Sequence, residues 1–271
     1  TELAADTPAF HRFLAQFGLP VDNIIASTEE RQVVGSNLPG FLQALSPEVK
    51  RDARYLSKFF SATAIGLFDA ALNYIWNEVV LNLRKKVVLY GVDLFFDAAV
   101  GGQNRANYSD EDDLDGIKDV VLLNTCLKLE LISDVVHKKL SHILTMRNDV
   151  AASHPNVDSI GGYELLGWLQ VCVRDVLEDR PSESAIHIKA LVENLKASVD
   201  PLDEPTKRRF EAEACNLSLP HISNLLITLF GLFVRPESPQ VLRANILTIA
   251  PVVWKGAEES RRFQVGATID R

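Results

Sequence analysis

Cysteine is scarce in this sequence of 271 residues, and its three cysteines, Cys126, Cys172 and Cys215, lie far apart in apolar surroundings. No Cys-x-x-Cys pair occurs, which argues against a structural zinc site, because such sites usually take their ligands in closely spaced pairs. An odd number of separated cysteines is typical of buried thiols in a reducing compartment. The sequence therefore predicts three buried free thiols and a cytoplasmic protein.

Long apolar runs and an excess of basic residues are also lacking. Residues 225–234 form the longest apolar run. It is about half of the roughly 18 residues that a membrane span requires, so we expect a buried helix there and no membrane contact. The first residues are acidic, which argues against a secretory signal, and the absence of an initiating Met suggests a fragment of a longer protein. The net charge of -8 excludes bulk attraction to nucleic acid, so any such contact needs a local basic patch.

Apolar residues recur at helical spacing along most of the chain, in which 47% of the residues are hydrophobic and 24% are charged. This pattern predicts an all-α protein with enough apolar side chains for one large core or two smaller ones. The clearest helix start is Ser46-Pro47-Glu48, where a capping serine, a first-turn proline and an acidic residue follow one another. Helices are expected over residues 10–17, 47–100, 117–153, 163–178, 184–199, 204–215, 219–234 and 237–255.

Glycine, proline and charged residues indicate where these helices break. Residues 47–100 are expected to form one very long helix, or two joined near Arg84-Lys85-Lys86. Residues 117–153 contain a potential break at Ser133-Asp134, and Pro155 ends that segment because proline disfavours helical geometry in the preceding residue. The segment that precedes Pro39-Gly40 is expected to be rich in loops.

The expected helices group into three consecutive regions. Residues 1–40 form an N-terminal extension that packs on the main body, and residues 41–180 form a helical domain. A boundary at Arg180-Pro181-Ser182 separates that domain from a C-terminal helical region, residues 181–271. Prolines punctuate the last region into short helices, which favours a bundle or the first layers of a solenoid.

Acidic residues gather between the expected helices, in the loop over residues 101–116. Aligned with a calcium-binding loop, Glu111, Asp113, Asp115 and Gly116 occupy suitable positions, but Leu122 stands where a bidentate acid is required. We therefore expect a solvated acidic loop, with no metal and no cofactor.

Residues 146–155 carry the chemistry that the rest of the chain lacks. Arg147 and His154 are seven residues apart. In a helix this spacing is about 700° of rotation, which places both on nearly the same face, with a rise of about 10 Å between them. The histidine leans back toward the arginine. Arginine is a forked donor for phosphate oxygens, and histidine exchanges protons near neutral pH. Together they suffice for metal-free RNA cleavage by the internal 2′-hydroxyl.

The segment Arg147-Asn148-x5-His154 resembles the Arg-x(4–6)-His motif of HEPN-domain ribonucleases, including the polar residue that often follows the arginine. The surroundings resemble that fold as well, with a long first helix over residues 47–86, a second helical unit that leads into the motif, a short loop, and a closing helix over residues 163–178. The resemblance covers roughly residues 45–180 and says nothing about the C-terminal region.

This resemblance implies a HEPN-like helical bundle that forms a homodimer, so that two motifs face each other across a cleft. It implies a metal-independent endoribonuclease, often part of a bacterial toxin or anti-phage defence system. His154 would be the general acid and base, Arg147 would bind the phosphate, and Asn148 would position either of them. Asn156 stands where some HEPN toxins carry a tyrosine that a partner enzyme modifies, so such control is not expected.

Other interpretations of these residues remain open. The bare motif is weak, because about one match is expected by chance, and a second match runs from Arg180 to His187. Arg147 and His154 also suit a helix C-terminus, where the helix dipole favours cations. The basic clusters Arg84-Lys85-Lys86 and His137-Lys138-Lys139 could guide RNA or simply face solvent. The alternative function is a non-catalytic helical dimerisation or scaffold module within a larger protein, with the C-terminal helices binding a protein partner.

Overall fold

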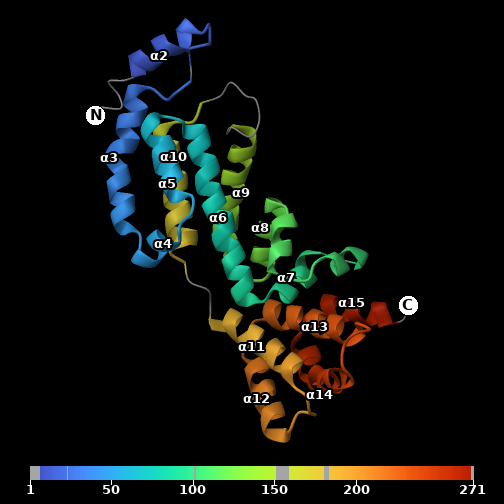
Figure 1. Ribbon diagram of the computed structural model, residues 1–271. Helices are drawn as coiled ribbons and strands as arrows, with labels where there is room; N and C mark the ends of the chain where they lie inside the picture. Colours follow the sequence, from blue (N-terminus) through green and yellow to red (C-terminus); the bar gives the residue numbers. More distant parts are fainter. Residues whose placement is uncertain (1–6, 23, 101, 151–158, 180–182, 270–271) are drawn as a thin grey trace. The chain divides into compact units, whose positions relative to one another are not determined.

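The computed structural model describes residues 7–22, 24–100, 102–150, 159–179 and 183–269 (Figure 1). Every regular element in these ranges is helical, and no strand occurs among them, so the expected all-α class is confirmed. Within the same ranges, no helix combines the length and the hydropathy needed to cross a membrane.

The helices divide into two compact units, and each unit is built from two separate segments of the chain. Unit 1 consists of residues 1–83 and 135–179, and unit 2 consists of residues 84–134 and 180–271. This division departs from the three consecutive regions expected from the sequence. The N-terminal extension belongs to unit 1, and residues 84–134 group with the C-terminal region. The first crossing lies inside a helix, Phe68–Tyr90, which is long enough to contribute to two cores.

Unit 1 is built from helices of both its segments. From the first segment come α2 (Thr7–Gln16), α3 (Thr28–Ala44), α4 (Pro47–Asp52), α5 (Leu56–Ile65) and the first part of α6 (Phe68–Tyr90). The second segment supplies nearly all of α9 (Asp134–Asp149), then α10 (Gly162–Cys172) and a π-helical turn, η3 (Val173–Leu177).

The long helix expected over residues 47–100 is four helices, α4 to α7 (Val92–Ala99). Its start is confirmed, because the Ser46 hydroxyl accepts the Val49 N–H at 3.3 Å. Gly66 ends α5 at φ +91° and Gly91 separates α6 from α7 at φ +120°, conformations that favour glycine. The predicted join near Arg84-Lys85-Lys86 is wrong, because these residues lie within α6.

The loop-rich expectation for the segment before Pro39-Gly40 is wrong for most of its length, where α3 forms instead. The Ser27 side chain caps α3 by accepting the Glu30 N–H at 3.2 Å. Val34 and Leu38 are buried, and α3 packs on α10. Because this packing stabilises the helix, it tolerates Pro39 in its interior, despite the backbone hydrogen bond that proline removes.

Unit 2 combines the end of α6 and α7 with the C-terminal helices. Between α7 and α9 lie two 3₁₀ turns, η1 (Gly102–Asn107) and η2 (Glu111–Gly116), and α8 (Asp119–Lys128). The four C-terminal helices that the prolines predicted are present, and one further helix follows them. These are α11 (Glu183–Ala197), α12 (Glu204–Cys215), α13 (Leu219–Val234), α14 (Gln240–Gly256) and α15 (Glu259–Ile269).

The core of unit 2 forms around α13, which packs against α7, α14 and α15. Leu225, Leu229 and Leu232 are buried, which confirms the buried helix expected over residues 225–234. Two of the three cysteines are buried as expected, and burial raises the pKa of the Cys126 and Cys172 thiols to about 12. The expectation is wrong for Cys215, which is exposed at the last position of α12, beyond its buried face.

Candidate functional site

Arg147 lies in the last turn of α9, three residues after the buried Leu144. Leu140, Ile143 and Leu144 bury one face of α9 in the core, and the helix ends at Asp149. Arg147 and Asn148 are partly exposed. The periodic apolar face of α9 therefore fixes the helix in unit 1 and leaves the first two residues of the motif accessible to solvent.

Two amide oxygens orient the Arg147 guanidinium. Its Nε donates to Asn73 Oδ1 of α6 at 2.9 Å, and its Nη1 donates to Asn148 Oδ1 at 3.0 Å. The Asn73 amide is itself held, because its Nδ2 donates to the Asp69 carbonyl at 3.2 Å. Asn73 and Asn148 are neutral, so these two bonds orient the guanidinium without neutralising its charge.

The third predicted site residue, His154, lies outside the described residues. The structure thus brings Arg147 and Asn148 together, and it adds Asn73, which no sequence pattern indicated. Asn73 is one of several asparagines on α6. Only the tertiary packing of α6 against α9 distinguishes it from the others.

The part of α6 in unit 1 has one partly exposed side. Ala71, Leu72 and Ile75 are fully buried. A second set of α6 residues recurs at helical spacing and is partly exposed. We call this side the α6 stripe, and it consists of Asp69, Ala70, Asn73, Tyr74 and Asn77. α9 contacts the stripe through Arg147 and Asn73, and Tyr55, the residue before α5, contacts it through Tyr74.

The basic clusters found in the sequence engage acidic partners. Lys139 Nζ lies 2.7 Å from Asp175 Oδ2, and Arg174 Nε lies 2.8 Å from Asp175 Oδ1. Burial alone would raise the pKa of the Asp175 carboxyl, but its hydrogen bonds and the charges of Arg174 and Lys139 outweigh burial and lower it. In the other cluster, Arg84 pairs with Asp115 and Lys86 is buried. Neither cluster is therefore a simple solvated face.

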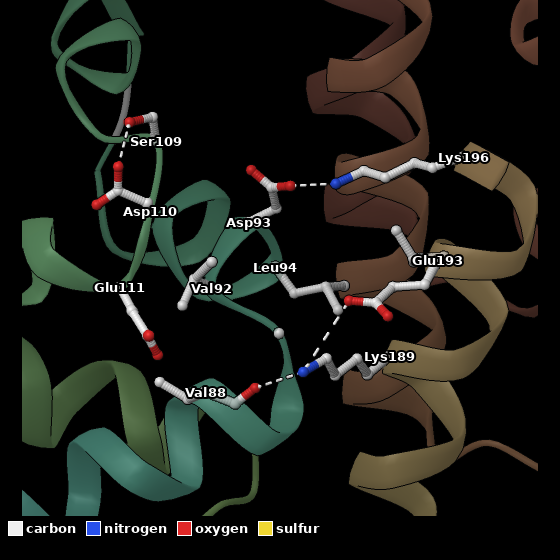
Figure 2. A pocket seen from close by; sticks show the side chains of 12 residues that line it. Val88, Val92, Asp93, Leu94, Ser109, Asp110, Glu111, Lys189, Glu193 and Lys196 are labelled. Atoms are coloured by element: carbon white, nitrogen blue, oxygen red, sulfur yellow. Dashed lines mark hydrogen bonds and ion pairs between the residues drawn. The ribbon is translucent and has the colours of Figure 1, made fainter.

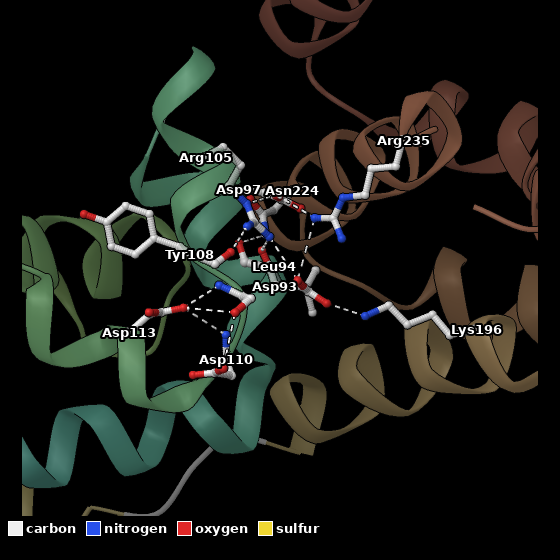
Figure 3. Close-up of polar contacts among 11 residues, drawn as sticks. Asp93, Leu94, Asp97, Arg105, Tyr108, Asp110, Asp113, Lys196, Asn224 and Arg235 are labelled. Atoms are coloured by element: carbon white, nitrogen blue, oxygen red, sulfur yellow. Dashed lines mark hydrogen bonds and ion pairs between the residues drawn. The ribbon is translucent and has the colours of Figure 1, made fainter. Parts of the chain in front are cut away.

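Unit 2 contains an ionic cluster of two carboxylates and three cations, Asp93, Asp97, Arg105, Lys196 and Arg235 (Figure 3). Arg105 Nε lies 2.6 Å from Asp97 Oδ1, and its Nη2 lies 3.0 Å from Asp93 Oδ1. Lys196 of α11 also bonds to Asp93. Desolvation raises the pKa of Asp97, whose side chain is only 8% exposed, despite the nearby charge of Arg105. For Asp93, desolvation is outweighed by Lys196 and Arg105, and the pKa is lowered.

A cavity of about 260 Å³ lies beside this cluster, lined by residues of α6, α7, η2 and α11 (Figure 2). Its walls include Val88, Val92 and Val192. Its two lysines are engaged, because Lys189 Nζ donates to the Val88 carbonyl at 3.0 Å and Lys196 bonds to Asp93. The polar groups of the cavity therefore connect α11 to α6 and α7.

The acidic loop uses its carboxylates within the chain. Asp113 Oδ2 accepts the Ser109 N–H at 2.6 Å and the Asp110 N–H at 3.2 Å, and these bonds lower the Asp113 pKa. Asp110 and Asp113 together form a capping box for η2. In the part of the chain that the structure describes, no group of three or more His, Cys, Asp or Glu residues is arranged to hold a metal ion.

Comparison with known proteins found no family model that matches the chain, and no curated protein or solved structure with significant similarity to it. The resemblance to HEPN ribonucleases therefore depends on the motif residues and on the order of the helices around them.

Proposed function

We propose that this chain is a metal-independent endoribonuclease of the HEPN type, acting in the cytoplasm within a bacterial toxin or anti-phage defence system. The observation that carries the proposal is the arrangement of Arg147, whose guanidinium two neutral amide oxygens orient at the end of α9. One of those oxygens belongs to Asn148, the next residue of the motif. The order of α9 followed by the closing helix α10 supports the same assignment.

The reaction needs a proton acceptor, a proton donor and stabilisation of the phosphate. His154 takes the proton from the 2′-hydroxyl, whose oxygen attacks the neighbouring phosphorus. The bond from phosphorus to the 5′-oxygen breaks, and that oxygen receives a proton from the second copy's motif or from water. Arg147 stabilises the negative charge that develops on the phosphate oxygens. The products are a 2′,3′-cyclic phosphate and a 5′-hydroxyl end.

The test is RNA cleavage by the purified protein in the presence of a chelator. Wild-type protein should cut RNA, and His154→Ala should abolish cutting without changing the melting temperature. His187→Ala is the matched control, because His187 belongs to the second match of the motif and is exposed on α11. Cleavage retained in His154→Ala, or lost equally in both variants, would contradict the proposed role of His154.

A second candidate function, a non-catalytic interaction module, is favoured by α2. Phe10 and Phe13 of α2 are exposed, as is Phe17 in the turn that follows it, where the side chain is 67% exposed. Exposed aromatic patches of this kind often mark protein interfaces. Such a module would bind a protein partner and would not cut RNA. Phe13→Ser and Phe17→Ser should then each weaken the complex with that partner. Cleavage that depends on His154 would reject this candidate as the sole function.

A further inference from the structure

Two tyrosines and a lysine form a cluster at the edge of the α6 stripe. The rings of Tyr55 and Tyr74 are nearly parallel, at an interplanar angle of 22°, with centroids 6.5 Å apart. Lys58 Nζ lies 5.1 Å from the Tyr55 centroid and 6.0 Å from the Tyr74 centroid. Both tyrosines are partly exposed and Lys58 is exposed. We call Tyr55, Lys58 and Tyr74 the tyrosine–lysine cluster.

A buried carboxylate fixes the backbone of this cluster. Glu78 is only 5% exposed, and its Oε2 accepts the Tyr55 N–H at 2.6 Å. Glu78 lies one turn after Tyr74 on α6, so the same face of α6 holds one tyrosine and anchors the other. The Glu78 bond therefore holds the Tyr55 backbone next to α6, where the Tyr55 ring lies beside that of Tyr74.

The cluster lies beside the residue that orients Arg147. Tyr74 directly follows Asn73, whose side chain accepts the hydrogen bond from Arg147 Nε. Their Cα atoms are thus about 3.8 Å apart, and both residues belong to the α6 stripe. Successive helical residues differ in direction by about 100°, so the contact of Arg147 with Asn73 and the contact of Tyr55 with Tyr74 are made at different positions around α6. A strand lying along the stripe could reach both.

The chemistry of the cluster suits one nucleotide of a single-stranded RNA. Aromatic rings stack on bases of any sequence, and a nearby lysine attracts the phosphate backbone. Asn77, on the stripe between the edges, offers donors and acceptors for sugar or base. The acidic chain as a whole does not attract RNA, so a local set of this kind is what binding requires.

We propose that Tyr55, Lys58 and Tyr74 form a binding subsite for a nucleotide of single-stranded RNA, next to the phosphate that Arg147 holds. This inference rests on the proposed ribonuclease function for the identity of its ligand. The tyrosines stack on the base, and Lys58 contacts the neighbouring phosphate. The subsite contributes equally to binding of the substrate and of the transition state. It therefore affects the affinity for RNA and not the rate of the chemical step.

Binding is measured by fluorescence anisotropy on the His154→Ala protein, with a labelled single-stranded RNA of mixed sequence and about 12 nucleotides. Tyr74→Ala and Tyr55→Ala should each raise the Kd about 5- to 150-fold, the range found when base stacking is removed. Tyr74→Phe should retain wild-type affinity, because it keeps the ring. Phe263→Ala, which removes an exposed aromatic of α15, is the matched control and should leave the Kd unchanged.

Two further variants test whether a loss of binding comes from the missing ring or from unfolding, and whether the charge of Lys58 contributes specifically. Tyr74→Leu retains apolar bulk but no ring, so it should melt near the wild-type temperature and bind as weakly as Tyr74→Ala. Lys58→Ala should reduce the salt dependence of binding, whereas Lys50→Ala, an exposed lysine of α4, should not. In cleavage assays, Tyr74→Ala should raise KM and leave kcat within about twofold.

The outcomes distinguish this subsite from the proposed function. If wild-type protein cuts RNA and the tyrosine variants bind and cut like the Phe263→Ala control, the subsite is overturned and the ribonuclease stands. If RNA binds in a ring-dependent manner but is never cut, the subsite stands and the ribonuclease proposal fails. If His154→Ala protein binds no single-stranded RNA at all, the subsite is overturned.

Discussion

Unit 1 and unit 2 each hold a partly buried arginine, but they hold it with different partners. In unit 1, Asn73 and Asn148 orient Arg147 through neutral amide oxygens. In unit 2, Asp93 and Asp97 bind Arg105 as ion pairs of 3.0 and 2.6 Å. The two amides help to fix the direction of the Arg147 guanidinium, whereas the two carboxylates also compensate the charge of Arg105. The comparison therefore separates a guanidinium oriented by neutral amides, which we propose to contact the substrate phosphate, from a guanidinium whose charge is compensated within the chain.

The largest effect is expected from Arg105→Ala. This change leaves Asp97, 8% exposed, without its nearest compensating charge. Breaking a buried pair on one side costs about 3–5 kcal/mol of unfolding free energy. Urea denaturation of the whole protein should show this loss of unfolding free energy. Arg208→Ala, at a surface pair whose arginine is 80% exposed, is the control and should change stability by less than about 0.5 kcal/mol. Equal effects from the two changes would remove the stabilising role of the ionic cluster.

Arg147→Ala should have a large effect on cleavage and a small effect on stability. Loss of one group that stabilises the transition state lowers kcat about 10²–10³-fold. The unfolding free energy should fall by only about 1 kcal/mol, because neutral hydrogen bonds of a partly exposed side chain contribute modestly. Cleavage kinetics and urea denaturation of the same preparation measure both quantities. Wild-type kcat in this variant would show that Arg147 does not contact the reacting phosphate.

Asn73→Asp converts the arrangement of unit 1 into that of unit 2. The new carboxylate would pair with Arg147, and an ion pair worth up to about 1 kcal/mol would then compete with the substrate phosphate. We expect cleavage to fall about fivefold, with stability unchanged or slightly increased. Ala70→Asp adds the same charge to the α6 stripe at a residue with no assigned contact to RNA, and it is the matched control. An equal decrease in both variants would indicate general repulsion of RNA, not pairing with Arg147.

The same two regions differ in how much the sequence revealed. Ser46-Pro47 marked the start of α4, and the prolines of unit 2 marked four of its helices, because caps and breakers act locally. α3 was missed because burial of Val34 and Leu38 against α10 outweighs Pro39. Arg147 and Asn148 were selected from the motif, but Asn73 was not. Its role depends on a contact with Arg147, 74 positions away in the chain, which no local pattern encodes.

The smallest effect is expected at Asp175, where unit 1 has an ion-paired cluster of its own. The pKa of this carboxyl is lowered from its ordinary value of 3.8, so its pairing stabilises the fold above that pH and is lost as the pH falls through the lower folded value. Asp175→Asn should therefore cost up to about 1 kcal/mol at pH 7, because Arg174 is largely exposed and water screens its charge.

The stability difference between wild type and Asp175→Asn should persist at pH 5 and shrink below about pH 4, as measured by urea denaturation at each pH. Asp52→Asn, which removes an exposed carboxylate of α4, is the control and should show little effect at any pH. A difference of the same size at pH 7 and pH 3 would mean that the shape of the side chain, and not its charge, is what Lys139 and Arg174 require. In that case unit 1 would hold no cation by charge compensation at this position, and the contrast between the two units would be sharper still.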